Sequence, residues 1–106
     1  MNISGNLNLQ EISFPSLTFL PGDLNIENNA RLTNILVPNL HETFNGVLSI
    51  SSNPLLVTLD LRSINCHAIS IINLSKNLGL ETVYLQSSQC SSLIKIDTPR
   101  TTFIYT

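Results

Sequence analysis

The chain has 106 residues, of which 42% are hydrophobic and 11% are charged, and its net charge is −2. That length suits one domain with an apolar core, while five Lys and Arg scattered along the chain are too few for a nucleic-acid interface or a basic membrane-binding face. No run reaches the ~18 apolar residues of a membrane-spanning helix, and the first residues have neither the charged nor the apolar region of a secretory signal.

Apolar residues recur along the chain every 22 to 24 residues, which indicates a repeat protein. The first column of equivalent residues consists of Ile3, Ile26, Ile50, Leu74 and Ile96. Other apolar residues recur at fixed distances after each member of this column. In the second unit they are Leu32, Ile35 and Val37. We therefore expect a single domain divided into coils at about residues 1–21, 22–45, 46–69, 70–91 and 92–106.

Each unit contains two segments in which every second residue is apolar. In the second unit they are Leu24-Asn-Ile26 and Ile35-Leu-Val37, and both patterns return in the third and fourth units. A period of two indicates strands with one apolar face. The sequence therefore predicts an all-β solenoid, resembling a leucine-rich repeat, of about 4.5 coils with two short strands per coil. Parallel coils would stack about 4.8 Å apart.

An asparagine follows the first apolar column by three residues in four units. The column consists of Asn6, Asn29, Asn53 and Asn77, and Pro99 stands at this position in the fifth unit. Asparagine tolerates the left-handed backbone conformation of a sharp corner, and its amide can bond backbone groups of the next coil. We expect a structural asparagine ladder along one corner of the solenoid.

The segment from Gly22 to Leu40, GDLNIENNARLTNILVPNL, resembles the repeat of receptor L-domains. These domains occur in insulin- and EGF-receptor ectodomains and in fungal cell-wall proteins of the Ecm type. Residues 46–56 repeat the first half of this pattern, and residues 3–17 match the second half. The resemblance implies a right-handed β-helix, an extracellular or cell-surface location, and a binding or wall-associated role without catalysis.

The two cysteines, Cys66 and Cys90, are 24 residues apart, which is one full coil. They should lie above one another on adjacent coils, with Cα atoms near the ~5 Å that a disulfide accepts. They form either an inter-coil disulfide of a secreted protein or two reduced thiols in a column of small residues. A metal site is not expected, because His67 should face away from Cys66 and His41 falls in a different column.

Two sequons offer candidate glycosylation sites, at Asn2 (Asn2-Ile3-Ser4) and at Asn73 (Asn73-Leu74-Ser75). Asn73 lies between two inward-facing residues of its strand, so its side chain should face solvent. The alternative is that they are chance sequons, which are expected in a chain with 13 Asn and 13 Ser.

The seven acidic residues occupy different positions in different coils, apart from Glu27 and Asp97, which lie three coils apart. General acid–base catalysis would need two or three of them clustered on one face, and column neighbours do not assemble a Ser–His–Asp arrangement. We therefore expect neither an enzyme nor a cofactor.

The outward residues on and beside the second strand of each unit have more apolar character than the outward face of the first strand. We expect the partner face to consist of Leu36, Val57, Asp60, Arg62 and Tyr84, because exposed aromatic and apolar groups with a few polar neighbours favour protein interfaces. The chain would then be a recognition module for a protein or carbohydrate. The alternative is a structural spacer that self-associates through the open ends of the solenoid.

Overall fold

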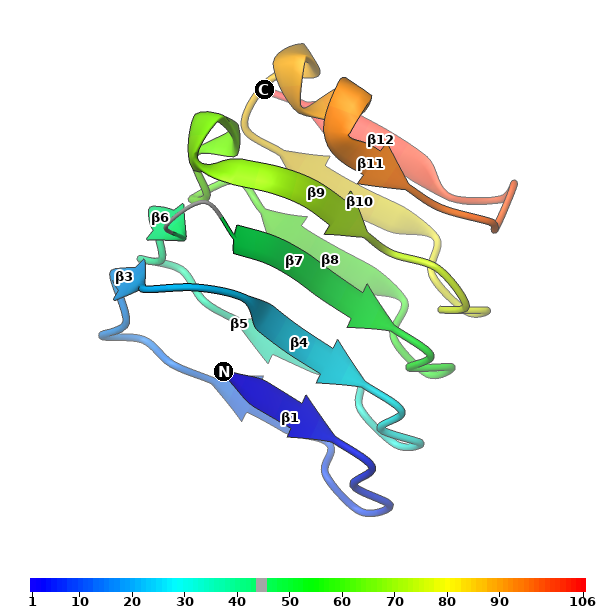
Figure 1. Cartoon of the computed structure of the whole chain (residues 1–106). Coiled ribbons are helices and arrows are strands. Elements are labelled where there is room, and N and C mark those ends of the chain that lie inside the picture. The colour runs from blue at the N-terminus through cyan, green and yellow to red at the C-terminus, as the bar shows by residue number, and fades with distance from the viewer. Residues whose placement is uncertain (44–45) are drawn as a thin grey trace.

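The computed structural model describes residues 1–43 and 46–106, and it shows a β-solenoid of about four turns. The coils stack in parallel, with β1 at one end and β12 at the other, so the two termini lie at opposite ends of the stack (Figure 1). The all-β solenoid expected from the repeat is confirmed.

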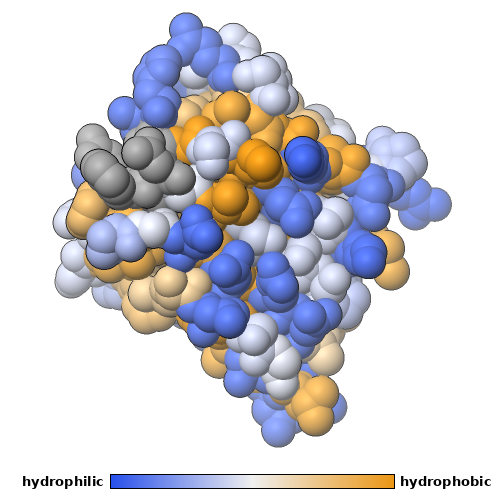
Figure 2. Space-filling view, in the orientation of Figure 1, coloured by the Kyte–Doolittle hydropathy of each residue, from blue (hydrophilic) through white to orange (hydrophobic). Residues whose placement is uncertain are grey.

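The first side of the solenoid is a single parallel sheet with one strand from each coil. Its strands, in spatial order, are β1 (Asn2–Ser4), β4 (Leu24–Glu27), β7 (Gly46–Ser51), β9 (Ile69–Asn73) and β11 (Ile94–Lys95). Ile3 pairs with Ile26, which pairs with Ile50, so the first apolar column forms a ladder through the interior. Hydrophilic side chains cover much of the outward face of this sheet (Figure 2).

The second side of the solenoid consists of two separate parallel sheets. One pairs β2 (Glu11–Ser13) with β5 (Asn34–Leu36), and the other joins β8 (Thr58–Leu61), β10 (Thr82–Leu85) and β12 (Thr102–Tyr105). Within residues 1–43 and 46–106, β5 and β8 lie close together but are not joined into one sheet. The second side is therefore interrupted between the second and third coils.

A third side, which the two-strand repeat does not include, closes each coil. In the first two coils it is the strand pair β3 (Phe19–Leu20) and β6 (Glu42–Thr43), and in the next two it is the 3₁₀ helices η1 (Cys66–Ala68) and η2 (Ser88–Leu93). Each helix begins after a polar cap, because Asn65 accepts a hydrogen bond from the His67 N–H and Ser87 accepts one from the Gln89 N–H.

The apolar columns fill the interior. Leu32, Leu56 and Leu80, which are equivalent residues of three successive coils, are all fully buried. The columns remain partly open at the two ends of the stack. The half-buried core residues are Ile3, Leu9, Phe14 and Leu17 in the first coil and Leu93, Ile94, Ile96 and Phe103 in the last.

Candidate functional site

The asparagine ladder holds one corner of the solenoid together. Asn29, Asn53 and Asn77 are 0% exposed. The backbone N–H and Nδ2 of Asn29 donate to Asn53 Oδ1 at 3.2 and 3.1 Å, and the same two groups of Asn53 donate to Asn77 Oδ1 at 3.0 and 3.3 Å. Asn53 Nδ2 also donates to the Ile26 carbonyl at 3.0 Å. The amides of Asn29 and Asn53 therefore each join three consecutive coils, and that of Asn77 joins two.

The expectation that these asparagines adopt the left-handed conformation is wrong. The residue before each of them has the positive φ angle instead, and these residues are Gly5 (67°), Asn28 (58°), Ser52 (55°) and Lys76 (61°). The chain turns at that residue, and the next side chain then points into the solenoid, where its amide reaches the neighbouring coils. Among these four left-handed residues, only Asn28 uses the conformational tolerance of asparagine directly.

Asp60 and Arg62 form the polar centre of the expected partner face. Arg62 donates from Nε to Asp60 Oδ1 at 3.0 Å and from Nη2 to Asp60 Oδ2 at 2.7 Å, which is a bidentate ion pair. The side-chain hydrogen bond from Arg62 lowers the pKa of the Asp60 carboxyl, and the same contact raises the pKa of Arg62. Arg62 Cζ also lies 5.0 Å from the centroid of the Tyr84 ring, within the range of a cation–π contact.

A hollow of about 500 Å³ opens beside this ion pair, where the second side is interrupted. Its lining residues are Ser13, Pro15, Ile35, Leu36, Val37, Pro38, Asp60, Arg62 and Ser63. Leu36 on β5 is 47% exposed, and Asp60 and Arg62 face it from the β8 side. An apolar floor is thus bordered on one side by a charged, hydrogen-bonding pair.

The structure brings together three of the five residues expected at the partner face, since Leu36, Asp60 and Arg62 line the hollow. Tyr84 adjoins them through Arg62, whereas Val57 is exposed outside the lining. Ser13 also lines the hollow, at the outward position of β2 equivalent to Leu36, whereas sequence reasoning missed Pro15, Pro38 and Ser63. The repeated proline after the second strand was the available signal.

A second exposed apolar feature was also missed. Leu7 and Leu78 follow the first column by four residues in their coils, and they are 73% and 76% exposed. Leu55 is half exposed in the same corner of the third coil. The shared position of Leu7 and Leu78 in the repeat was visible in the sequence.

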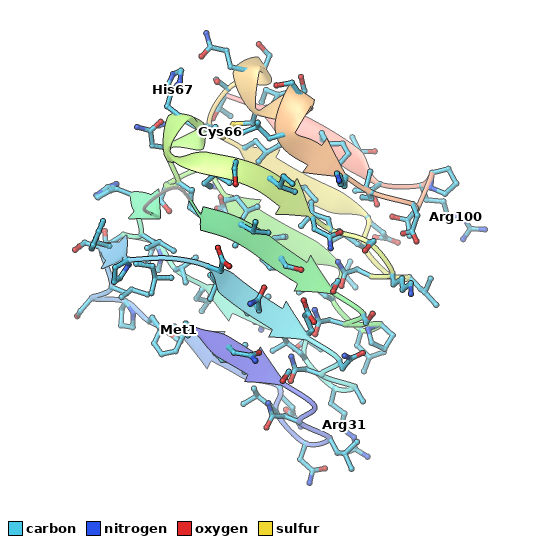
Figure 3. All side chains as sticks on the ribbon, viewed as in Figure 1. Met1, Arg31, Cys66, His67 and Arg100 are labelled. Atoms are coloured by element: carbon cyan, nitrogen blue, oxygen red, sulfur yellow. A yellow bond between two sulfur atoms is a disulfide. The ribbon has the colours of Figure 1, made fainter. Side chains whose placement is uncertain are left out.

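Cys66 and Cys90 form a disulfide, and their Cα atoms are 5.5 Å apart. Both residues lie in the 3₁₀ helices of the third side rather than in flat strands. The cross-link joins the third and fourth coils. Figure 3 shows His67 at the turn beside Cys66, with its ring directed away from the coil stack.

Loss of this disulfide should lower the free energy of unfolding by about 3 kcal/mol, because the cross-link restricts a 24-residue loop in the unfolded chain. The urea concentration at the unfolding midpoint of the wild type should decrease when a reductant is added. The double variant Cys66→Ala/Cys90→Ala is the control, since a reductant should not change its midpoint. If the midpoint of the wild type does not change in the presence of the reductant, that result would contradict the presence of the disulfide.

The two candidate glycosylation sites differ in their surroundings. Asn2 is exposed, whereas Asn73 is half-buried. Asn73 Nδ2 lies 3.4 Å from Ser49 Oγ, and its Oδ1 accepts a hydrogen bond from the Ser75 N–H at 3.2 Å. Asn73 is therefore less accessible than its outward strand position suggested, and modification of either residue stays a prediction.

Three of the acidic side chains serve as hydrogen-bond acceptors between coils. Asp23 accepts from the Val47 N–H, Asp97 from the Lys76 N–H, and Glu27 from the Ser49 hydroxyl. In the described part of the chain, no group of three or more His, Cys, Asp or Glu side chains is arranged to hold a metal ion.

Among the residues that the structure describes, no helix combines the length and apolarity needed to cross a membrane. No family model, curated protein or solved structure matches this chain. The arrangement of its own residues is therefore the basis for assigning a function.

Proposed function

We propose that this chain is a non-catalytic recognition module that binds a protein or carbohydrate ligand at the hollow on its second side. The observation that carries the proposal is an apolar hollow of about 500 Å³ with the Asp60–Arg62 pair at its border. Ligand sites in proteins are typically apolar concavities of this size with a few polar groups that orient the ligand.

The electrostatics of the hollow favour an uncharged ligand. Asp60 and Arg62 neutralise one another, so the border of the hollow is strongly dipolar without a net charge. Arg62 uses two of its five N–H donors on Asp60 through the side chain, which leaves three for a ligand. Peptide carbonyls and sugar hydroxyls are the acceptors that suit these donors, while the apolar part of the ligand would lie on Leu36 and Pro38.

The ion pair should be present at neutral pH. Because the folded-state pKa of Asp60 is lowered by Arg62, the favourable interaction exists above the ordinary carboxyl pKa and is lost as the pH falls through the lowered value. Ligand binding should accordingly be insensitive to pH near neutrality.

An extracellular or cell-surface location belongs to the same proposal. A disulfide between coils and the exposed Asn2 sequon support it, because structural disulfides persist in oxidising compartments. The receptor L-domain relationship and the right-handed winding that it implies are also part of the proposal, and the repeat pattern of residues 22–40 supports them.

Replacing Leu36 by Asp or Arg62 by Ala should weaken ligand binding at least tenfold, because these changes remove the apolar floor or the hydrogen-bond donors of the hollow. The wild type would be screened against an oligosaccharide array and a displayed peptide library, and each hit would be measured by calorimetry. Leu78→Asp is the matched control, since Leu78 is also an exposed leucine but lies at a different corner. A ligand that tolerates Leu36→Asp but not Leu78→Asp would overturn the assignment of the site.

A second candidate function is structural, namely assembly of chains through the ends of the solenoid. The half-buried core residues at both ends support it, because a terminal coil leaves apolar columns and strand edges without a neighbour.

A further inference from the structure

The N-terminal coil combines partly uncovered core side chains with a strand edge that no second strand of residues 1–43 and 46–106 pairs with. Ile3, Leu9, Phe14 and Leu17 are only half-buried there, although the equivalent residues of the second coil are fully buried. β1 pairs with β4 on one side, and it is the outermost strand of its sheet (Figure 1).

The backbone of β1 offers hydrogen-bonding groups away from the molecule. The Met1 carbonyl accepts from the Asn25 N–H at 2.9 Å, and the Gly5 N–H donates to the Glu27 carbonyl at 3.1 Å. Because bonded groups alternate along a parallel strand, the backbone groups of Asn2 and Ser4 point outward from the stack. An unpaired edge of this kind is a template for another strand.

The corner of the same coil has an open acceptor as well. In every later ladder position, Oδ1 accepts from the asparagine of the preceding coil. Within residues 1–43 and 46–106, no donor reaches the Oδ1 atom of Asn6.

The C-terminal end is built differently. Its last unit contains the exposed charged residues Lys95, Asp97 and Arg100, and Arg100 lies at the corner of that end (Figure 3). Pro99 replaces the ladder asparagine and has no N–H to donate. Charges and proline at an edge oppose strand addition, whereas residues 1–21 contain Glu11 as their single charged side chain.

We infer that the N-terminal coil is an interface for a second copy of this chain, related by a two-fold axis. The inference rests on the second candidate function above. In this arrangement β1 of each copy runs antiparallel to β1 of the other, and Asn2 of one copy exchanges backbone hydrogen bonds with Ser4 of the second copy. The apolar columns of the two solenoids then meet at Ile3, and the interface is closed, so assembly stops at a dimer.

The size of the end face is sufficient for such a dimer. The principal-axis extents of the molecule are 32 × 29 × 19 Å, so an end face covers roughly 550 to 930 Å² and two faces bury about 1,100 to 1,900 Å² in total, which overlaps the range of specific interfaces. A head-to-tail contact would use the charged C-terminal end and would continue into a filament.

Sedimentation velocity of the 106-residue chain over a wide concentration range tests the inference. The weight-average mass should rise reversibly from that of one chain to that of two and then stay constant. The double variant Asn2→Lys/Ser4→Lys should remain monomeric, because it places like charges opposite one another across the proposed pair. Both side chains are exposed, and an unchanged unfolding midpoint would show that the variant is folded.

The double variant Thr102→Lys/Ile104→Lys is the matched control, since it adds the same charges to exposed positions of the edge strand β12 at the other end. It should dimerise like the wild type. If it abolishes association and the Asn2/Ser4 variant does not, assembly is real but uses the other end, and the inference is wrong. A wild type that is monomeric at every concentration would overturn both the inference and the assembly function, and it would leave binding at the hollow unaffected.

Discussion

Replacing Asn53 by Ala should lower the free energy of unfolding by about 4 kcal/mol. The substitution leaves the buried Asn29 N–H and the Ile26 carbonyl without their side-chain partner, and each buried group that loses its hydrogen bond costs roughly 1 to 3 kcal/mol. The loss should be measured by urea unfolding at neutral pH, with the midpoint and slope compared to those of the wild type.

Asn6→Ala is the control for this prediction because Asn6 occupies the same column at the exposed end. Its Nδ2 donates to Asn29 Oδ1 at 3.0 Å and to the Ser4 carbonyl at 3.2 Å, but water can replace both contacts. The destabilisation should therefore be several-fold smaller than at Asn53. Equal losses at the two positions would mean that burial does not determine the strength of the ladder.

Replacing Leu59 by Ala should destabilise the fold by about 2 to 5 kcal/mol, because the truncation leaves a cavity in a well-packed core. Leu59 is 1% exposed and pairs with Val83 on β10 in the middle of the stack. Equivalent apolar residues lie in the coils above and below Leu59. The neighbouring coils therefore cannot move into the cavity without shifting the register of their own strands.

Asp60→Ala is the control, since Asp60 adjoins Leu59 on β8 but points outward. Its ion pair with Arg62 is about half exposed on both sides, and exposed pairs contribute little to stability. Thermal and urea unfolding of the two variants should therefore differ clearly. A similar loss for both would contradict the assignment of inward and outward faces along the strand.

The repeat could be predicted from the sequence because the same spacing of apolar residues in each unit places equivalent residues next to one another in successive coils. Spacing alone predicts that Ile3, Ile26 and Ile50 share one column, and the structure pairs them in that register. A shift by one residue would have turned every apolar side chain of a strand outward. Burial of one face thus makes the register predictable.

The hollow could not be predicted in this way. Ile35 and Leu59 belong to the same column, yet β5 and β8 are in separate sheets. Columns show which side chains are stacked, but they do not show whether the backbones between them approach closely enough to pair. The same limit applies to the left-handed residues, because Gly5, Asn28, Ser52 and Lys76 share a conformation without sharing a residue type.

The position of the disulfide divides the solenoid into parts of unequal local stability. Coils three and four are joined covalently through Cys66 and Cys90, while the first two coils are held by stacking and hydrogen bonds alone. In a repeat protein each coil is stabilised mainly by its immediate neighbours, so the free energy of local opening should increase from the first coil toward the cross-linked pair. Fraying that begins at β1 would therefore stop at the third coil, and the cross-linked half would remain as a template on which the first coils refold.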